Sequence, residues 1–481
     1  MLKDLLEGLD YKLLQGNLDQ DISHICYDSR LVQSGDMFVC LCGLKDDGHC
    51  FIEQAIRQGA KVIMIEKMVP CQEGVTYIKV ENTRYALAIL SCAFFHYPSH
   101  QMTVIGITGT KGKTTVAYMI RSILKKANKK VGMIGTTGTY IHDKHYPTHN
   151  TTPESYDIQC MMNKMIEAHC EYCVMEVSSQ GLMLDRVTGI DFDYGIFTNL
   201  SEDHIGEGEH HSFEEYMNCK KKLFQMCKIG LFNQDDPYYL DIIQNIDCQI
   251  KTYSLYHHSD IKAKNIQPLF SSQLAISFQT QGSINTMIEC GIPGYFNVYN
   301  ALAAIFVCQD LDIPLCFIQG ALQSICIPGR LQRVAKNAPY YIMIDYAHNA
   351  YAYENLFQML HDYHPHHIYC IYGAGGHRDK HRRYEVGKIV AKHHGISIVT
   401  ADNPRGENIL DICQDIIKGI KEYDGKYVVI EDRKEAIYYA LSHAKKGDFV
   451  LCLGKGHEDY QIIGKERLPF SERKIIEEYF K

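Results

Sequence analysis

Short apolar runs recur along the chain and alternate with longer segments in which apolar residues return every three or four positions. The runs predict buried strands, and the longer segments predict helices that pack on a sheet. In the first part of the chain, a helix is expected over Phe51–Gln58, ended by Gly59, and the N-terminal MLKDLLEGLDYKLL is typical of a short amphipathic helix. Strands are expected there at Met37–Leu41, Lys61–Ile65 and Thr76–Lys79.

A strand, a glycine-rich turn and a helix follow one another in the middle of the chain. The strand TVIGIT covers residues 103–108, a helix is expected over Thr115–Lys126, and strands at Tyr172–Val177 and Asp193–Thr198 continue the pattern. This order is typical of a parallel sheet with crossover helices. After residue 331, strands are expected at Tyr341–Ile344, Ile368–Tyr372, Ile396–Thr400, Tyr427–Ile430 and Asp448–Leu453.

These patterns predict an α/β protein of three domains. Pro98 breaks the helix before it and places a linker at residues 95–102, and a second change of pattern falls near residue 331. We therefore expect a smaller N-terminal α/β domain (1–97), a central domain with a doubly wound, mainly parallel sheet (98–330), and a C-terminal Rossmann-like α/β domain (331–481). A chain of 481 residues is long enough for several separate cores.

The composition is typical of a soluble globular protein, with 46% hydrophobic and 22% charged residues. The net charge of −8 argues against nucleic-acid binding through overall charge, and no run approaches the roughly 18 apolar residues of a membrane span. The 19 cysteines are scattered and no export signal precedes them, which predicts free thiols in a reducing cytoplasm. Cys170 and Cys173 are expected to be buried structural residues, and His210 and His211 to be solvated loop residues.

The turn that follows the strand at 103–108 has the residues of a phosphate-binding loop. Gly109 and Gly112 allow backbone N–H groups to face an anion, and the N-terminus of the next helix adds partial positive charge. Lys113 has the reach for terminal phosphate oxygens, and the Thr114 hydroxyl is suited to Mg²⁺. The strict P-loop pattern is missed, because Ile107 stands where its first glycine belongs. We still expect the central domain to be a P-loop domain.

Polar side chains end two of the predicted central strands. Glu176 ends one strand, and Asp203 and His204 follow the other. Strand C-termini face the ligand crevice of a doubly wound sheet, so Glu176 and His204 are expected to meet Mg²⁺ beside the phosphates. A P-loop alone does not distinguish a kinase, a motor, a GTPase and a ligase.

The segment ADNPRGEN, residues 401–408, follows an apolar strand and carries a positioned cation. Pro404 fixes its own φ and pushes Asn403 toward an extended shape. Arg405 is thereby expected to be held in place rather than left to move along the surface. A guanidinium in a fixed position binds a carboxylate through two parallel hydrogen bonds.

Eight motifs occur together in one order: GTKGKTT, MEVSSQGL, FTNLSEDH, GYFNVYNALAA, DYAHNA, GAGGHRDKHRR, ADNPRGEN and GKGHEDYQI. In this order they resemble the Mur ligase family, and within it the cytoplasmic enzymes that add the third residue of the peptidoglycan stem peptide. The match runs from about Tyr27 onward. The resemblance implies that ATP phosphorylates the D-glutamate carboxylate of UDP-N-acetylmuramoyl-L-alanyl-D-glutamate, and that the amine of a diamino acid then attacks the acyl phosphate.

The resemblance also implies roles for individual residues. For ATP it implies Gly109, Thr110, Lys111, Gly112, Lys113, Thr114, Thr115, Asn300, Arg330, Asp345 and His348. For the UDP-sugar peptide it implies Ser29, Thr151, Thr152, Ser178 and Arg186. For the amino acid it implies Arg378, Asp402, Asn403, Pro404, Arg405, Gly454 and Glu458. For Mg²⁺ and catalysis it implies Lys113, Thr114, Glu176, His204 and Lys220, the last of them carrying a carbamate formed with CO₂.

Arg405 favours meso-2,6-diaminopimelate as the added amino acid, because L-lysine lacks the second carboxylate that a guanidinium binds. Residues 205–216, IGEGEHHSFEEY, resemble lysine-adding relatives instead, so L-lysine or another diamino acid stays open. Lys111 and Gln180 replace an asparagine and a histidine of the family pattern. The segment DSR at 28–30, with DNPR and GKGHED, argues against a folylpolyglutamate or cyanophycin synthetase.

A P-loop ATPase or nucleotide-binding regulator without ligase activity is the alternative from a different class. Such a protein is expected to hydrolyse ATP without a nucleotide-sugar acceptor, or not to hydrolyse it. For the ligase we expect a monomer that neither binds nucleic acid nor inserts into a membrane.

Overall fold

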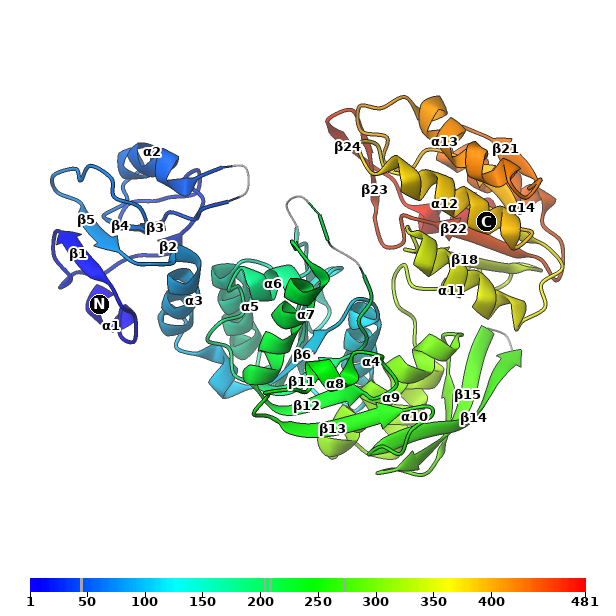
Figure 1. Cartoon of the computed structure of the whole chain (residues 1–481), viewed down its shortest axis with the longest axis horizontal. Helices are drawn as coiled ribbons and strands as arrows, with labels where there is room; N and C mark the ends of the chain where they lie inside the picture. Colours follow the sequence, from blue (N-terminus) through cyan, green and yellow to red (C-terminus); the bar gives the residue numbers. More distant parts are fainter. Residues whose placement is uncertain (44–45, 203–204, 207–209, 271–273) are drawn as a thin grey trace. The chain divides into compact units, whose positions relative to one another are not determined.

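The computed structural model describes residues 1–43, 46–202, 205–206, 210–270 and 274–481. The chain forms two compact units, and Figure 1 shows the helices and strands of the whole chain. The first unit holds Met1–Lys262 and Leu302–Ile318, and the second holds Ala263–Ala301 and Gln319–Lys481. Both units are mixed α/β structures, as the residue pattern predicted. In the part of the chain that the structure describes, no helix combines the length and the apolar character needed to cross a bilayer.

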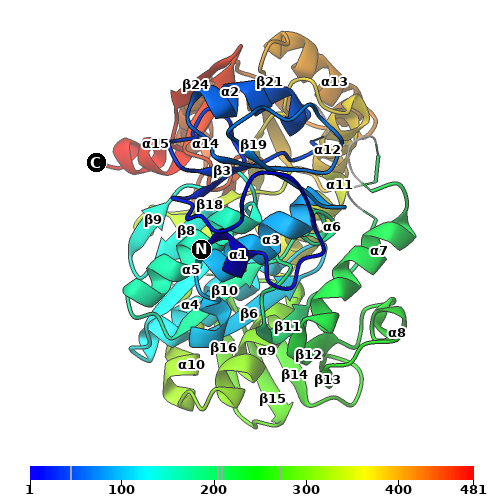
Figure 2. The same cartoon turned by 90° about the vertical axis from the view of Figure 1, so that its left-hand side faces the viewer.

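The N-terminal part of the first unit is a sheet with the strand order β1-β5-β4-β3-β2. Strands β2 to β5 run parallel, and β1 pairs antiparallel with β5. The strands are β1 (Lys12–Gln15), β2 (Ile25–Cys26), β3 (Met37–Val39), β4 (Val62–Ile65) and β5 (Thr76–Lys79). The helices are α1 (Leu2–Leu5), the 3₁₀ turn η1 (Gly48–Phe51), α2 (Ile52–Arg57) and α3 (Thr83–Phe94). Helix α3 packs against α5 (Ser155–Glu167) (Figures 1 and 2).

One N-terminal prediction was wrong in part. The helix expected over MLKDLLEGLDYKLL ends at Leu5, and Lys12–Gln15 is an edge strand. Gly8 lies between them with a φ of 82°, a left-handed conformation that glycine adopts readily and that does not continue a helix. The backbone groups of residues 12–15 are satisfied by pairing with β5 instead of by helical hydrogen bonds.

The central part of the first unit contains the strand order β13-β12-β11-β6-β10-β7-β8-β9. Neighbours from β13 to β7 are parallel, and β8 and β9 extend the sheet antiparallel. Its strands are β6 (Thr103–Thr108), β7 (Val131–Gly135), β8 (Gly138–Ile141), β9 (Lys144–Tyr146), β10 (Tyr172–Glu176), β11 (Phe192–Phe197), β12 (Cys227–Asn233) and β13 (Gln249–Ser254). The other helical segments are η2 (Pro98–Gln101), α4 (Lys113–Lys126), α6 (Ser179–Met183), α7 (Phe213–Lys221), η3 (Lys222–Gln225) and α8 (Tyr239–Ile242). The predicted parallel sheet with crossover helices is confirmed.

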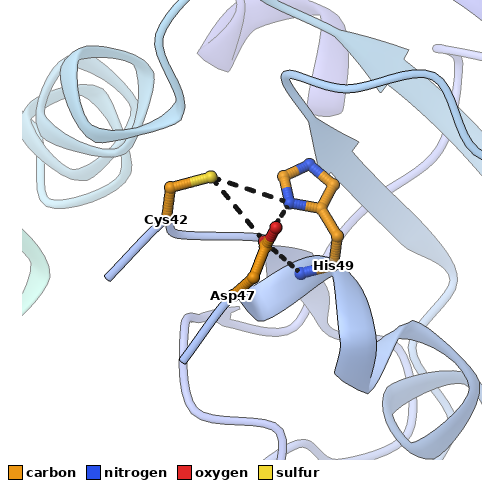
Figure 3. A group of neighbouring side chains, drawn as sticks. All are labelled: Cys42, Asp47 and His49. Atoms are coloured by element: carbon orange, nitrogen blue, oxygen red, sulfur yellow. Dashed lines mark hydrogen bonds and ion pairs between the residues drawn. The ribbon is translucent and has the colours of Figure 1, made fainter. Parts of the chain in front are cut away.

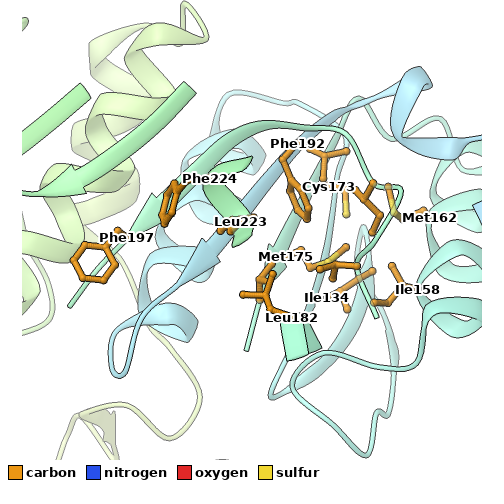
Figure 4. Packing of buried hydrophobic residues seen from close by; sticks show 14 of the residues in the cluster. Ile134, Ile158, Met162, Cys173, Met175, Leu182, Phe192, Phe197, Leu223 and Phe224 are labelled. Carbon is orange, nitrogen blue, oxygen red and sulfur yellow. The ribbon is translucent and has the colours of Figure 1, made fainter. Parts of the chain in front are cut away.

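Apolar side chains from this sheet and its helices form a core (Figure 4). Ile134 and Met175 come from strands, Ile158 and Met162 from α5, and Leu182 from α6, and all five are buried. Burying one such side chain stabilises the fold by about 1.5–3 kcal/mol. Because β6, β10 and β11 are anchored in this core or beside it, the loops that leave their carboxyl ends start from fixed points.

The second unit contains a sheet with the strand order β17-β18-β22-β19-β20-β21, in which β17 alone of these strands is antiparallel to its neighbour. The strands are β17 (Gln332–Val334), β18 (Tyr341–Asp345), β19 (Ile368–Tyr372), β20 (Ile396–Val399), β21 (Tyr427–Val429) and β22 (Phe449–Leu453). The helices are α11 (Ala350–His361), α12 (Lys380–Lys392), α13 (Ile409–Lys421), α14 (Arg433–His443) and α15 (Glu472–Tyr479). All strands that were expected after residue 331 are present.

Several elements were not predicted. Besides β17 with β18, the described residues of the second unit form antiparallel pairs of β15 (Leu274–Gly282) with β16 (Met287–Cys290) and of β23 (Tyr460–Ile463) with β24 (Glu466–Pro469). Strand β14 (Ile261–Phe270) and the helices α9 (Tyr295–Asp310) and α10 (Leu315–Gln323) each contribute residues to both units. Strand β24 is exposed along its whole length, so no apolar run marks it in the sequence.

Candidate active site

The glycine-rich loop links β6 to α4 through two glycines whose φ angles are positive. Gly109 has a φ of 142°, and a Cβ at this position would collide with the Thr198 hydroxyl. Gly112 caps α4 with a φ of 87°, and Lys113 is the first residue of the helix. Thr198 Oγ1 donates a hydrogen bond to the Lys111 carbonyl oxygen at 2.7 Å, which fixes the loop to the end of β11. The N–H groups of the first helical turn are therefore presented at a rigid turn.

Lys113 lies against its own loop. Its Nζ donates to the carbonyl oxygens of Gly109 at 2.8 Å and Thr110 at 3.2 Å. The Thr110 hydroxyl lies 3.0 Å from the hydroxyl of Tyr216 on α7. These contacts place an ammonium beside the first turn of α4, where terminal phosphate oxygens are expected to bind.

A second lysine reaches the same loop from α7. Lys220 is buried, with 1% of its surface exposed, and its Nζ donates to the Gly109 carbonyl oxygen at 3.0 Å. The same Nζ lies 4.3 Å from the centre of the Tyr216 ring. Lys221 is partly buried and Lys222 is exposed, so the structure separates Lys220 from the other lysines of this run.

A buried carboxylate at the end of β10 faces the start of α4. Glu176 is fully buried and accepts hydrogen bonds from the Thr114 hydroxyl at 2.8 Å and from the Thr136 hydroxyl at 3.0 Å. The Thr136 backbone N–H also donates to it at 2.9 Å. The structure thus brings Thr114 and Glu176 together, and it adds Thr136, which sequence reasoning missed. His204, the other predicted ligand, lies outside the described residues.

One histidine prediction was wrong. His210 was expected to be solvated, but its side chain is fully buried and its Nε2 lies 2.9 Å from the Ser179 hydroxyl. Its ring packs against Tyr216 with the ring centres 5.2 Å apart. Packing between α6 and α7 encloses this position, and no local pattern in HHS signals it. His211 is exposed, as expected.

The residues implied for the muramoyl peptide gather next to Glu176. The Thr152 hydroxyl donates to the Glu176 carbonyl oxygen at 2.9 Å and accepts from the Ser178 backbone N–H at 2.9 Å. Arg186 Nη1 donates to the Thr152 carbonyl oxygen at 3.0 Å. The Thr151 hydroxyl lies 3.0 Å from that of Thr136. Four of the residues that the resemblance implies for the muramoyl peptide therefore lie in one cluster: Thr151, Thr152, Ser178 and Arg186.

A carboxylate that the sequence did not mark joins this cluster to helix α3. Glu154 pairs with Arg186 at 2.8 Å and with Arg84 of α3 at 3.2 Å. Arg84 also donates to the Cys42 carbonyl oxygen at 3.4 Å, and the Tyr27 hydroxyl donates to Asp157 at 2.5 Å. Glu154 therefore fixes the guanidinium of Arg186, because a charged hydrogen bond is stronger than a neutral one.

Ser29 lies apart from these contacts. It is buried, with 7% of its surface exposed, and its hydroxyl donates to Gln54 of α2 at 3.2 Å. Its neighbours Asp28 and Arg30 form a local ion pair at 2.6 Å.

Cys42, Asp47 and His49 form a compact cluster between the end of β3 and the 3₁₀ turn η1 (Figure 3). The cysteine Sγ lies 3.7 Å from Asp47 Oδ1 and 3.9 Å from His49 Nδ1. His49 Nε2 accepts hydrogen bonds from the backbone N–H groups of residues 66 and 67, at 3.2 and 3.4 Å, which leaves the ring proton on Nδ1. That proton is donated to Asp47 at 2.6 Å, so the nitrogen that a metal would need is already occupied. The Lys67 ammonium pairs with Asp47 and lowers the pKa of its carboxyl, so the contacts of this cluster have a structural role.

In the second unit, three of the residues implied for ATP surround Tyr346. The Arg330 guanidinium lies 4.7 Å from the centre of its ring, and His348 Nδ1 lies 2.8 Å from its carbonyl oxygen. Asp345 accepts from the backbone N–H groups of residues 331 and 347, at 2.7 and 2.8 Å, and burial raises the pKa of its carboxyl. Burial and the nearby Arg330 charge lower the pKa of His457 to about 4, so this ring is neutral at pH 7. Asn300 is buried on α9 and bonded to Asn297 at 3.0 Å.

The residues implied for the amino acid also come together, at the carboxyl ends of β20 and β22. Asn403 Nδ2 donates to Glu458 at 2.9 Å, and Gly454 lies against Asp402. Arg405 has a φ of 53°, and its Nη1 donates to the Gly376 carbonyl oxygen at 2.8 Å. The space next to Gly375 is bordered by the side chains of Arg405 and Arg378. Pro404 packs its carbonyl group against Gly376.

A buried ion pair supports the group of residues implied for the amino acid, which is called the amino-acid pocket from here on. Arg433 on α14 is fully buried and pairs with Glu472 of α15 at 2.7 Å. Its Nη1 donates to the carbonyl oxygen of Ala401 at 3.2 Å, and its Nη2 donates to that of Leu453 at 2.8 Å. These two carbonyls stand immediately before Asp402 and Gly454. The ends of β20 and β22 are therefore tied to one guanidinium beneath the pocket.

Three family models match the chain. They describe the Mur ligase family catalytic domain at residues 21–95, the Mur ligase middle domain at 107–308, and the Mur ligase glutamate ligase domain at 329–456. Two curated relatives carry the name UDP-N-acetylmuramoyl-L-alanyl-D-glutamate--2,6-diaminopimelate ligase. The one from Clostridium perfringens is 43% identical, and the one from Caldanaerobacter subterraneus is 42% identical; each match covers 99% of this chain and 98% of the relative.

A solved structure with the same name is similar over almost the full length. It has a TM-score of 0.70 and 26% sequence identity, and the match covers 98% of both chains. The family models, the two relatives and this similar structure support the family that the order of motifs in the sequence predicted. This chain belongs to the Mur ligase family.

Proposed function

We propose that this Mur ligase uses ATP to join meso-2,6-diaminopimelate to the D-glutamate carboxylate of UDP-N-acetylmuramoyl-L-alanyl-D-glutamate, in peptidoglycan synthesis. The observation that carries the choice of amino acid is the clustering of Asp402, Asn403 and Glu458, with Arg405 bonded to the neighbouring Gly376 carbonyl oxygen. Carboxylates that receive an ammonium stand there beside a guanidinium that receives a carboxylate. The names of the two relatives support the same substrates.

The proposed reaction activates the acceptor carboxylate as an acyl phosphate before the amine attacks it. A carboxylate oxygen of the acceptor attacks the terminal phosphorus of ATP, which gives an acyl phosphate and ADP. The amine of diaminopimelate then attacks the acyl carbon, and the tetrahedral intermediate expels phosphate and loses a proton to form the amide. Lys113 and the N–H groups at the start of α4 are the groups that orient and neutralise the phosphates.

Thr114 and Glu176 fit a magnesium ion. Hydroxyl and carboxylate oxygens are the ligands that this hard cation prefers, and the two side chains already meet at 2.8 Å. His204 and a carbamate on Lys220 would complete the ligands, as in the family. Mg²⁺ supplies positive charge to the phosphate oxygens when it is bound. Thr151, Thr152, Ser178 and Arg186 would hold the muramoyl peptide, and Ser29 the uridine.

The experiment that tests the function measures ADP release by the wild-type chain. The assay contains ATP, the UDP-N-acetylmuramoyl dipeptide, and meso-diaminopimelate, L-lysine or another amino acid in turn. We expect ADP release to require both the acceptor and the diamino acid, and to be fastest with meso-diaminopimelate. ADP release without the acceptor would favour a P-loop ATPase, and the absence of any amide product would refute the ligase.

We also predict that Lys220 carries a carbamate in the active enzyme. Its neutral amine adds CO₂ and releases a proton, which turns a buried cation into an oxygen-bearing anion. Replacement of Lys220 by alanine is expected to lower kcat by about 10²-fold or more, because positioned electrostatic groups at the transferred phosphoryl have effects of that size. The partly buried neighbour Lys221, replaced by alanine, is the control and should retain activity.

Carbon-13 NMR of enzyme equilibrated with labelled CO₂ gives a readout separate from turnover. A carbamate signal should be present in the wild type and in Lys221→Ala, and absent from Lys220→Ala. A wild-type enzyme that is active and shows no such signal would contradict the modification.

A further inference from the structure

Lys455 is a fully buried lysine beneath the amino-acid pocket. It follows β22 and stands between Gly454, with a φ of 101°, and Gly456, with a φ of 58°. These left-handed glycines turn the chain sharply on both sides of the lysine. The exposed fraction of its side chain is 0%, and lysine is among the residues that are almost never fully buried without a partner.

The Lys455 ammonium has three oxygen partners. Its Nζ lies 3.4 Å from Asp402 Oδ1, 3.2 Å from Asn403 Oδ1 and 3.3 Å from Glu458 Oε2. Asn403 is oriented by this contact, because its Oδ1 also accepts from the Ile462 N–H at 3.0 Å and its Nδ2 donates to Glu458 at 2.9 Å. One ammonium therefore connects both carboxylates and the amide of the pocket.

The depths of these groups differ. The side chains of Asp402 and Glu458 keep 13% and 15% of their surface exposed, whereas Lys455 has none. A ligand that enters from solvent consequently meets the carboxylates, with the ammonium behind them. Other ionisable groups lie around this cluster: Glu472 is paired by Arg433 at 2.7 Å, and the Tyr460 ring, whose centre lies 5.6 Å from the lysine Nζ, has the Arg467 guanidinium 3.6 Å from its centre.

Lys455 offsets one of the two negative charges of the pocket. Two carboxylates and one ammonium leave a single uncompensated negative charge, which equals the charge of one incoming ammonium. Two carboxylates without the lysine would present twice that charge in a partly buried site, and a desolvated charge without a partner is costly. The far end of meso-diaminopimelate carries one ammonium and one carboxylate, and Arg405 is available for the carboxylate.

We propose that Lys455 is a positioning residue that sets the charge and geometry of the amino-acid pocket, so that Asp402 and Glu458 together receive one ammonium beside the carboxylate held by Arg405. This inference rests on the proposed function. Lys455 acts on the substrate through Asp402, Asn403 and Glu458, not by contact. Loss of Lys455 leaves an extra negative charge in the pocket. The pocket then favours an amino acid whose far end carries only an ammonium, such as L-lysine, over one whose far end carries both an ammonium and a carboxylate.

The test compares Lys455→Met with the wild type in the full-length protein. We expect the KM for meso-diaminopimelate to rise about tenfold or more, while the KM for ATP and for the UDP-sugar acceptor changes less than about twofold. Tenfold corresponds to about 1.4 kcal/mol, which is close to the lower end of the range for one charged hydrogen bond. The ratio of kcat/KM for meso-diaminopimelate to that for L-lysine should fall about tenfold. The exposed Lys465, changed to methionine, is the matched control and should leave all these values unaltered.

A merely structural role predicts a different result, in which both amino acids and all three substrates are affected alike, and this result would overturn the proposal. So would unchanged values for Lys455→Met. If the variant is unstable, the double variant Lys455→Met with Glu458→Gln provides the second measurement. Removing one carboxylate charge should raise the Tm of the double variant above that of Lys455→Met alone. A lower Tm would refute the idea that Lys455 balances the charge of the two carboxylates. A wild-type protein inactive with every diamino acid would instead refute the proposed function and the substrate part of this inference, whereas the Tm comparison needs no substrate.

Discussion

Replacing Lys113 by alanine is expected to lower kcat by at least about 10²–10³-fold, the usual effect of removing one positioned electrostatic group from a reacting oxygen. The lysine begins α4 and its ammonium lies beside the glycine-rich turn. The fold should be retained, because the side chain is only partly buried and alanine is a good helix former. ADP release in the presence of acceptor and diamino acid measures the effect, and circular dichroism checks the fold.

Lys126 provides the matched control for this substitution. It ends the same helix, is exposed, and lies at the opposite end from the glycine-rich loop. Lys126→Ala should show wild-type kcat. Wild-type turnover by Lys113→Ala would contradict the assignment of this loop to ATP.

The second large effect is expected at Arg405. Changing it to methionine should lower kcat/KM for meso-diaminopimelate by about a hundred- to several-thousand-fold, because removing one partner of a buried ion pair costs roughly 3–5 kcal/mol. L-lysine has no second carboxylate, so its kcat/KM should change little and the preference between the two amino acids should collapse. The measurement is kcat/KM for both amino acids in the wild type and the variant.

Arg382 is exposed on α12 and serves as the control, since Arg382→Met changes the charge equally without touching the pocket. A wild-type enzyme that prefers L-lysine would show that Arg405 does not read the far carboxylate. The competing indication, the likeness of residues 205–216 to lysine-adding relatives, falls partly on residues outside those that the structure describes.

Local patterns in the sequence were sufficient for the parallel strands and the glycine-rich loop. The strands Thr103–Thr108, Thr76–Lys79 and Ile368–Tyr372 were predicted to the residue, because buried parallel strands are continuous apolar runs. Exposed β24 has no such run and was missed. The motifs of the family gave the candidate residues, but only three-dimensional packing shows which of them meet.

Residues whose role depends on distant parts of the chain were not predictable in this way. His210 is enclosed by helices, Thr136 reaches Glu176 from the end of a neighbouring strand, and Lys455 is buried beneath carboxylates 53 and 3 positions away. Each looks like an ordinary polar residue in its local segment. Burial and charge pairing across the fold decide their environment, and neither has a periodic signal.

The Arg433–Glu472 pair has a consequence for how substrate choice evolves in such an enzyme. It holds the backbone ends of β20 and β22 without using any side chain that we propose for amino-acid binding. Exchanges at positions 402, 405 or 458 therefore alter the chemistry that the pocket offers and leave its scaffold in place. Under the proposed function, a change of diamino acid would then involve the side chains at these positions and not the backbone that carries them.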